Sequence, residues 1–211
     1  MFDFPHPLRL AVGSHAAGSG KGCAMNVVSY ENGDTTITDM PACADPLLAR
    51  IVQRVNDSIC THRDGDLLCP SCSVKVLALA HRTVGTGGLV DLDRRRVWVW
   101  VAADQARAVL HLVTSPKALA AIEAAEAWAD DPSAENRANA YAAYAAAAVA
   151  YGANAAAYAA YDAAATTADS SLALAHRAVD RFYALTGLTE HAPDPERTAV
   201  ALASMTGARP A

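Results

Sequence analysis

Apolar residues recur at helical spacing in most long segments of this chain. No segment shows the sustained alternation of apolar and polar residues that is typical of a half-buried strand. In the clearest segment, 45–59, one helical face carries Leu47, Leu48, Ile51, Val52 and Val55. Asp45-Pro46 opens this segment, and Asp at the N-cap followed by Pro at the first helical position is a favoured helix start. The segment is therefore predicted to be an amphipathic helix that packs its apolar face on a core.

Similar start and stop signals divide most of the remaining chain into helices. Ser-Pro or Asp-Pro pairs open several of them, and Gly33 and Gly187 follow the ends of two others. The run VWVWV at 97–101 has strand propensity, but we favour a helix because the segment continues to Leu112 without a turn signal. The predicted helices cover residues 22–31, 45–59, 73–83, 91–113, 115–129, 133–169, 170–185 and 194–205.

This pattern predicts an all-α protein, a helical bundle of about seven or eight helices. The chain has 211 residues, a length suited to one domain, and it contains no stretch with the composition of a linker. We therefore expect a single helical domain that spans 1–211. Within it, 1–90 should form a loop-rich N-terminal motif region and 91–211 a helical bundle region.

The segment 133–169 is the most unusual of the predicted helices. More than half of its residues are alanine, the strongest helix former, and no charged residue occurs between Arg137 and Asp162. At about 100° per residue, one stripe of the helix carries Tyr144, Tyr151 and Tyr158, with Tyr141 beside it. We interpret the segment as a long central helix of the bundle, with a natural break at Gly152 to Asn154.

Three other roles are open to this helix. Its tyrosine stripe could pair two subunits, which would make the protein a homo-oligomer through 133–169. The stretch is long enough to cross a bilayer, but it lacks Leu, Ile and Phe and contains Asn139 and Asn154, so no membrane association is expected. Alanine-rich helices can also form an ice-binding surface. We expect the helix to be largely buried, either inside one subunit or between two.

Net charge and cysteine content narrow the functional classes. The formal net charge is −5 and the pI is about 5.7, which argues against a dedicated DNA- or RNA-binding protein because such proteins carry basic surfaces. The first ten residues, MFDFPHPLRL, contain an acid, two prolines and no long apolar run, so we expect no signal peptide. Five cysteines in such a chain predict a cytoplasmic protein with free or metal-bound thiols.

The best metal candidates lie in the predicted polar loop 60–72 and are Cys60, His62, Cys69 and Cys72. Thiolate and imidazole are groups that zinc prefers, and tetrahedral closure needs four ligands. The CPSC spacing at 69–72 lets two sulfurs meet one ion, and His81 is a substitute for His62. The pattern therefore indicates a zinc site, with free surface thiols and a redox dithiol as the two alternatives.

A second group of candidates, for ligand binding, consists of His15, Cys23, Asp39 and Cys43. A Cys and a His can form an activated nucleophile, with Asp39 orienting the imidazole. The two alternatives are a partial metal site and thiols that simply pack in the core. We expect the four residues to lie close together because the loops that carry them flank one short helix. The nearby GSGKG is not a phosphate-binding loop, because His15 stands where that motif requires its first glycine and no Ser or Thr follows the lysine directly.

Basic and aromatic residues adjoin at Arg94, Arg95 and Arg96 and the following Trp98 and Trp100. Such neighbours can bind nucleic acid by phosphate contact and base stacking. Because the run is otherwise apolar, we expect the tryptophans to face the core and the arginines to form a solvated helix start.

The N-terminal half resembles a group of uncharacterised actinobacterial and actinophage proteins with the pattern GSH, CxMxxVxY, G, DxPxC, P and ND. The matching residues are Gly13, Ser14, His15, Cys23, Met25, Val28, Tyr30, Gly33, Asp39, Pro41, Cys43, Pro46, Asn56 and Asp57. The resemblance continues to Arg107, and alanine-rich helices beyond that point are also typical of the group. It implies a phage or actinobacterial context and no particular mechanism. Two departures are Asn26, where the group has Glu, and the cysteines of 60–72, which would make any zinc site particular to this chain.

These observations favour a cytoplasmic helical binding or interaction protein, encoded by a phage, that acts on a host or phage macromolecule. A protein is the expected partner rather than a nucleic acid. The basis is the lack of a complete catalytic set and of a cofactor fingerprint in the sequence. The alternatives are a small enzyme or small-ligand binder that uses the group of His15 and Cys23, and a zinc-stabilised nucleic-acid binder that uses loop 60–72 and the arginines.

Overall fold

The computed structural model describes residues 9–13, 15, 19–112, 115–152 and 168–206, and this part of the chain is built from helices. Its only extended pairings are two isolated bridges, in which Leu67 pairs with Ala11 and with Asp64. The helices are α1 (Ala24–Asn32), α2 (Pro46–Ser58), α3 (Pro70–His81), α4 (Asp91–Val109), the 3₁₀ turn η1 (Leu110–Leu112), α5 (Pro116–Asp130), α6 (Ala134–Gly152), α8 (Ala168–Thr186) and α9 (Pro195–Thr206). The prediction of an all-α protein with about eight helices is confirmed.

Most helix ends follow the signals in the sequence. The Asp45 carboxylate accepts a backbone hydrogen bond of 2.9 Å at the start of α2, and Asp194 does the same at the start of α9 (3.0 Å). Gly33 and Gly187 adopt a positive φ directly after α1 and α8. The VWVWV run lies inside α4, so the helix predicted there is confirmed.

Two helix starts differ from the prediction. Helix α3 begins at Pro70 rather than Ser73, because Cys69 takes the N-cap position and proline suits the first turn. Helix α6 begins at Ala134, directly after Ser133, whose hydroxyl accepts the N–H of Asn136 at 3.2 Å. The Asp131-Pro132 pair, which is also a helix-start signal in the sequence, lies outside the helix. The first shift matters for function, since it moves two cysteines of the predicted loop onto the start of a helix.

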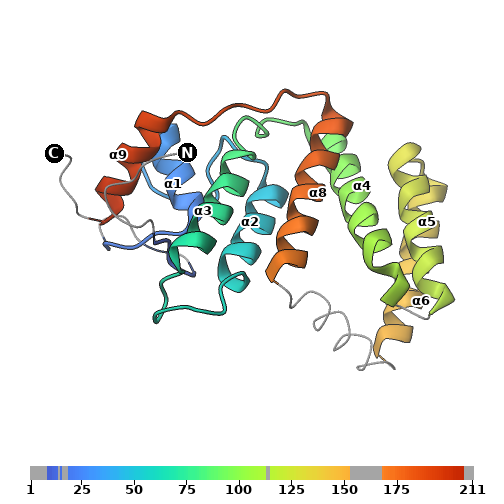
Figure 1. The fold of residues 1–211 in the computed structure, drawn as a ribbon. Coiled ribbons are helices and arrows are strands. Elements are labelled where there is room, and N and C mark those ends of the chain that lie inside the picture. Colours follow the sequence, from blue (N-terminus) through green and yellow to red (C-terminus); the bar gives the residue numbers. More distant parts are fainter. Residues whose placement is uncertain (1–8, 14, 16–18, 113–114, 153–167, 207–211) are drawn as a thin grey trace.

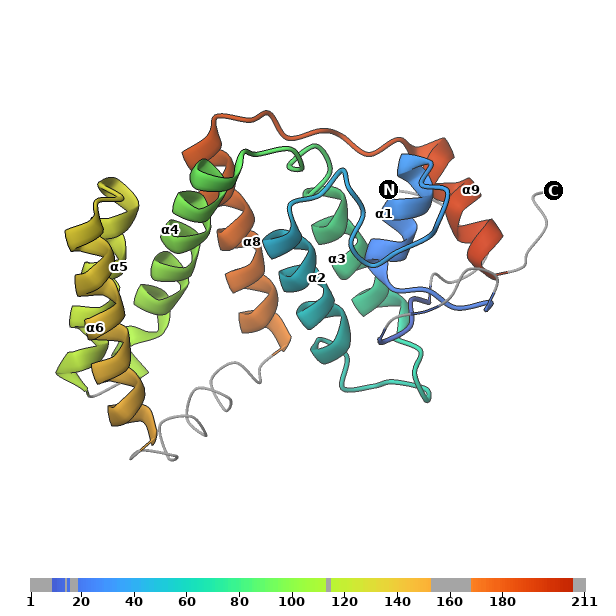
Figure 2. The same cartoon turned by 180° about the vertical axis from the view of Figure 1, so that it is seen from behind.

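The helices form an elongated row (Figures 1 and 2). At one end α1 contacts α2, α3 and α9; helix α8 packs between α2 and α4, and α5 and α6 follow beyond α4. Residues 187–194, here called the strap, run along one edge of the row and connect α8 to α9. The C-terminal helices therefore return to the N-terminal half, and both predicted regions contribute side chains to one core.

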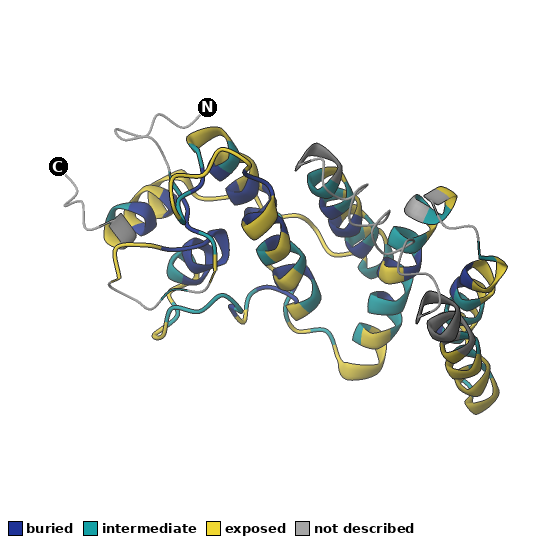
Figure 3. Cartoon of the chain, turned by 90° about the horizontal axis from the view of Figure 1, so that it is seen from below, coloured by how far each residue is buried: buried dark blue, intermediate teal, exposed yellow. Residues whose placement is uncertain are grey.

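Buried residues concentrate where α1, α2 and α3 face one another and meet α8 and α9 (Figure 3). Met25, Leu48, Leu79 and Phe182 are among the large side chains with no exposed surface. Burial on this scale is the main favourable contribution to folding, because it removes apolar surface from water. This core also fixes the loops that precede α1, α2 and α3, where the candidate functional residues lie.

Helix α6 lies at the end of the row, packed on α5, rather than at the centre of the bundle as the sequence suggested (Figures 1 and 2). Where exposure is described between Ala134 and Ala145, every residue is exposed or half-buried, and Tyr141 is 71% exposed. The physical reason is that alanine forms a helix without help from a core. Because each alanine buries little apolar area, little free energy draws such a helix into the interior.

The rest of the alanine-rich segment, 153–167, lies outside the described residues and includes Asn154 and Tyr158. The predicted break after Gly152 and the predicted pairing of subunits through this segment therefore stay predictions. Across the described helices, none combines the length and the apolar character that crossing a membrane requires.

The contribution of the Arg107–Glu126 ion pair, which joins α4 to α5, should be present at neutral pH and lost in acid. The Arg107 guanidinium donates two hydrogen bonds of 2.6 Å to the Glu126 carboxylate, which lowers the pKa of that carboxyl. A carboxyl with a depressed pKa stabilises the fold above its unfolded pKa, and this contribution disappears as the pH falls through the folded pKa. We expect Arg107→Met to lower the free energy of unfolding measurably at pH 7, by the small amount that is typical of a solvent-screened ion pair. The difference from the parent should vanish in acid, as measured by urea unfolding, whereas exposed Arg50→Met should cost little at either pH.

Candidate metal centre

The chain between α2 and α3 folds back on itself and brings three cysteines together. Cys60 is two residues beyond the end of α2 and is buried, while Cys69 is the N-cap of α3 and Cys72 lies in the first turn of that helix. Between them, the backbone groups of Asp64 and Leu67 exchange two hydrogen bonds of 3.0 and 3.1 Å around a tight turn. This turn reverses the chain direction, so that the start of α3 returns to the end of α2.

The Sγ atoms of Cys60, Cys69 and Cys72, here called the cysteine cluster, all lie within 4.8 Å of one another. In a tetrahedral zinc site with bonds of about 2.3 Å, neighbouring sulfurs are separated by about 3.8 Å. A small contraction would therefore let all three bind one ion. In addition, the Cys69 N–H donates a hydrogen bond to the Cys60 sulfur (3.3 Å), which holds the two segments in register.

Two thiols of the cluster, Cys69 and Cys72, differ in acidity. The hydrogen bond from the Ser71 hydroxyl (3.3 Å), together with bonds from the N–H and thiol of Cys72, lowers the pKa of Cys69 to about 6. Burial and the neighbouring sulfurs raise the pKa of Cys72 to about 12. The lowered pKa favours the thiolate form of Cys69, and a bound cation would favour deprotonation of the other two thiols by its own charge.

The cluster is anchored to the N-terminal arm, residues 9–13. Leu68 N–H donates to the Leu10 carbonyl (2.8 Å), and Leu10 N–H donates to the Ser73 hydroxyl (3.0 Å). The Arg9 guanidinium forms an ion pair with Asp64 (3.2 Å) in the turn between the cysteines. Any ligand of the three sulfurs would therefore act on the junction of α2, α3 and this arm.

Neither of the two histidines predicted as zinc ligands lies with the three sulfurs. His62 is exposed, its Nδ1 lies 3.2 Å from the Thr61 hydroxyl, and it does not belong to the group of sulfurs within 4.8 Å. His81 stands at the far end of α3, whose 12 residues span about 18 Å, so it cannot replace His62 as a ligand. The correction follows from helix geometry, because α3 separates the cysteines at its start from His81 at its end.

The four residues of the predicted ligand-binding group, His15, Cys23, Asp39 and Cys43, have different local environments. His15 Nε2 lies 2.8 Å from the Val12 carbonyl, and Asp39 receives a hydrogen bond from Gln53 on its backbone oxygen. Cys23 is 2% exposed in the core, where burial raises its pKa to about 11, so this thiol is inert at neutral pH. Cys43 lines a separate pocket. Among the hydrogen bonds of the described residues, none joins two of these four.

The arginine run is partly engaged by the fold. Arg96 Nε donates to the Ala129 carbonyl (2.6 Å) at the C-terminal end of α5, where a cation suits the helix dipole. Arg94 donates to the Leu89 carbonyl (2.6 Å), while Arg95 is exposed. Trp98 Nε1 donates to the buried Asp45 carboxylate (2.8 Å), so this tryptophan faces the body of the protein as expected. These contacts leave little of the run for nucleic acid.

Two sets of long-range hydrogen bonds were not predicted from the sequence. Asn56 is 1% exposed, and its amide binds the Ala11 carbonyl (2.9 Å) and the Ala24 N–H (3.3 Å). Glu31 pairs with His81 across 50 residues, with both carboxylate oxygens 3.0 Å from Nε2. The only signal in the sequence was polarity within apolar helices, which does not identify a partner.

Comparisons with known proteins add no relative from which a role could be transferred. Searches with protein-family models, against curated protein sequences and against solved structures found no match to this chain.

Proposed function

We propose that this chain is a helical metal-binding protein that holds one zinc ion through the cysteine cluster. The observation that carries the proposal is the convergence of the Cys60, Cys69 and Cys72 sulfurs within 4.8 Å, from two segments on either side of a tight turn. Thiolates are preferred ligands of zinc, and structural zinc sites commonly use a Cys-x-x-Cys pair with a further cysteine. The Cys69–Cys72 pair provides that spacing, and Cys60 supplies the third sulfur.

Three protein ligands leave one position of a tetrahedral ion for a water molecule or another donor. Cys69 and Cys72 are only half-buried, so this position would face solvent. A partner macromolecule that offers a carboxylate, imidazole or thiolate could complete the coordination. This extends the wider proposal of a binding protein, and a protein partner is favoured because the net charge is −5 and two of the three adjacent arginines are engaged internally.

Zinc binding is expected to be stoichiometric and to require the Cys-x-x-Cys pair. Reduced, metal-free protein should take up one zinc per chain, measured by competition with a chromogenic chelator and by elemental analysis. The Cys69→Ser, Cys72→Ser double variant should take up none. At a free zinc concentration 100 times the Kd, the free energy of unfolding of the parent should rise by about 2.7 kcal/mol.

Two matched variants make this test specific. Cys43→Ser removes a thiol outside the cluster and should bind zinc like the parent, and His62→Ala should retain one zinc because its ring lies outside the group of sulfurs. Zinc uptake that survives in the double variant, or that is lost equally in Cys43→Ser, would contradict the assignment of the site.

A thiol–disulfide function of Cys69 and Cys72 is the second candidate. The observation that favours it is the position of the two thiols at the start of α3, with their sulfurs within 4.8 Å of each other. Hydrogen bonds from Ser71 and Cys72 also lower the pKa of Cys69, whereas burial raises that of Cys72. A solvent-accessible thiol of low pKa followed by a less acidic partner is the arrangement of dithiol oxidoreductases. Reversible formation of a Cys69–Cys72 disulfide in glutathione buffers, in protein that takes up no zinc, would favour this candidate over the first.

A further inference from the structure

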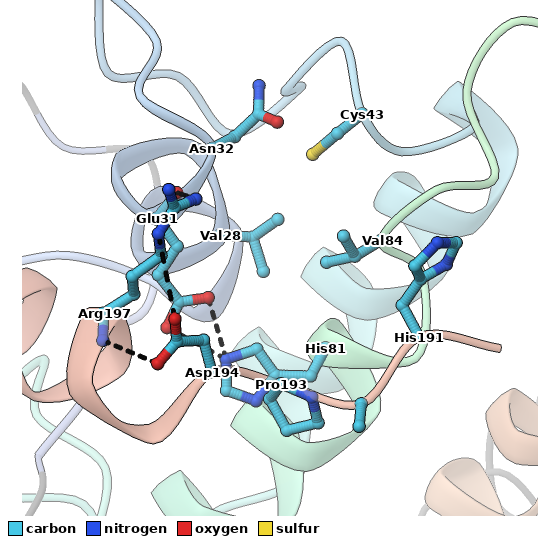
Figure 4. A pocket seen from close by; sticks show the side chains of 11 residues that line it. Val28, Glu31, Asn32, Cys43, His81, Val84, His191, Pro193, Asp194 and Arg197 are labelled. Carbon is cyan, nitrogen blue, oxygen red and sulfur yellow. Dashed lines mark hydrogen bonds and ion pairs between the residues drawn. The ribbon is translucent and has the colours of Figure 1, made fainter.

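A cavity of about 200 Å³ lies between α1, the end of α3, the strap and the start of α9, away from the cysteine cluster. Figure 4 shows Val28 and Val84 on its sides, Cys43 and Asn32 at one end, and Glu31 with His81 at the other. The volume is below the roughly 300–1,000 Å³ of sites for drug-sized ligands, so an occupant must be a small molecule.

The wall around Cys43 is held rigidly by the glycine loop, residues 84–88. Gly85 and Gly87 each donate a backbone hydrogen bond to the Cys43 carbonyl, at 2.8 and 3.1 Å. The ring of His191 from the strap lies directly against Gly85, where an added Cβ would stand 2.7 Å from Nδ1. Because backbone contacts from two sides define this wall, the cavity is preformed rather than created by loose side chains.

The polar end of the cavity carries a buried carboxylate. The side chains of Glu31 and His81 are 12% and 7% exposed, and His81 supplies a single nitrogen to the two Glu31 oxygens. A carboxylate accepts about four hydrogen bonds, so Glu31 retains acceptor capacity. At the mouth, Asp194 and Arg197 lie 3.9 Å apart and largely offset each other's charge.

Carboxylates outnumber guanidinium groups around the cavity. Glu31 and Asp194 contribute two carboxylates and Arg197 one guanidinium, while His81 Nε2 pairs with Glu31. Burial, and after it the negative charges of Asp34 and Glu31, raise the pKa of Cys43 at the opposite end. A buried carboxylate is poorly screened by solvent and favours a cation.

We propose that this pocket binds a small primary alkylammonium ion, with the ammonium group on the Glu31 carboxylate and the short alkyl chain between Val28 and Val84. The ammonium group would donate to the acceptor positions that His81 leaves free. The apolar side walls exclude water from the chain of the ligand. This site is independent of the zinc proposal, so either proposal can fail without the other.

The test uses butylammonium as the probe, with butyrate and butanol as the anionic and neutral molecules of matched chain length. Two-dimensional NMR titration of the full chain should show saturable shifts around Val28, Glu31 and Val84 with butylammonium. We expect a Kd of about 1 mM, within the range for a ligand of five non-hydrogen atoms. Butyrate and butanol should bind at least about 10-fold more weakly, because neither can donate a charge-assisted hydrogen bond to the Glu31 carboxylate.

Two variants separate charge from shape. Glu31→Gln keeps an acceptor for the His81 N–H but removes the charge, and it should weaken butylammonium binding about 10-fold or more. Glu196→Gln makes the same change on the exposed first turn of α9, outside the cavity wall, and should leave the Kd unchanged. Cys43→Leu fills the cavity without a change of charge and should abolish binding, with an unchanged circular dichroism spectrum.

Three outcomes would overturn the proposal. Butyrate or butanol that binds as tightly as butylammonium would remove the role of the carboxylate. An equal loss in Glu196→Gln and Glu31→Gln would reduce the effect to general surface charge. Full affinity in Cys43→Leu would place the cation outside the cavity.

Discussion

Gly87→Ala is expected to lower the free energy of unfolding by about 3 kcal/mol or more, and in a protein of ordinary stability this leaves the N-terminal half poorly folded. A Cβ at this position would stand 2.2 Å from the Ala42 carbonyl oxygen and 3.1 Å from the Cys43 carbonyl carbon. Both obstacles are backbone atoms, so no side-chain rotation relieves the overlap. Either the glycine loop or the turn before α2 must move.

Neither segment can move without losing buried hydrogen bonds. The Gly87 N–H donates to the Cys43 carbonyl, and the Thr86 hydroxyl accepts from the N–H of Asp45, which caps α2. Separation of the two segments would therefore leave buried polar groups unpaired as well as weakening the start of α2. The same separation would open the wall of the alkylammonium pocket.

Chemical denaturation monitored by circular dichroism measures this effect, with Gly88→Ala as the control. Gly88 has a φ of +96°, but an added Cβ would meet no atom within 4 Å, so the cost there is backbone strain alone, about 1–2 kcal/mol. If Gly87→Ala proved no more destabilising than Gly88→Ala, this would contradict the close contact between the backbones of Gly87 and Ala42.

Phe182→Ala is expected to lower the free energy of unfolding by about 3–5 kcal/mol. Phe182 has no exposed surface and lies on α8, the helix that contacts both α2 and α4. Truncation removes most of a large buried ring and leaves a cavity that the surrounding helices fill only in part. Because α8 connects the N-terminal helices to α4, the contact between the two parts of the row should weaken as well.

Unfolding by urea, followed at tryptophan wavelengths and by circular dichroism, measures both consequences. Phe182→Leu should cost much less than Phe182→Ala because it keeps most of the buried volume. Tyr183→Phe tests the adjacent half-buried ring and should cost about 1 kcal/mol, since it keeps the ring and removes only the hydroxyl, which donates to the Arg82 and Val84 carbonyls (2.8 and 3.4 Å). A loss below about 1 kcal/mol in Phe182→Ala would mean that α8 is not part of the main core.

The helices of this protein could be read from its sequence because their ends depend on local interactions. Asp45 and Asp194 cap helices by bonds to backbone groups two residues away, and Gly33 and Gly187 stop helices by adopting a positive φ. Such interactions need no distant partner, so they are visible in a single segment. The CPSC spacing likewise identified Cys69 and Cys72 as a pair, since only two residues separate them in the chain.

Only the tertiary structure decided which distant groups meet. Cys60 joins Cys69 and Cys72 because a turn reverses the chain, while His62 points to Thr61 and His81 ends the same helix far away, beside Glu31. The place of α6 at the end of the row was equally hidden, because alanine forms a helix whether or not anything covers it. Helix propensity and capping are properties of adjacent residues, whereas the packing of one helix on another depends on loops and contacts that no short segment specifies.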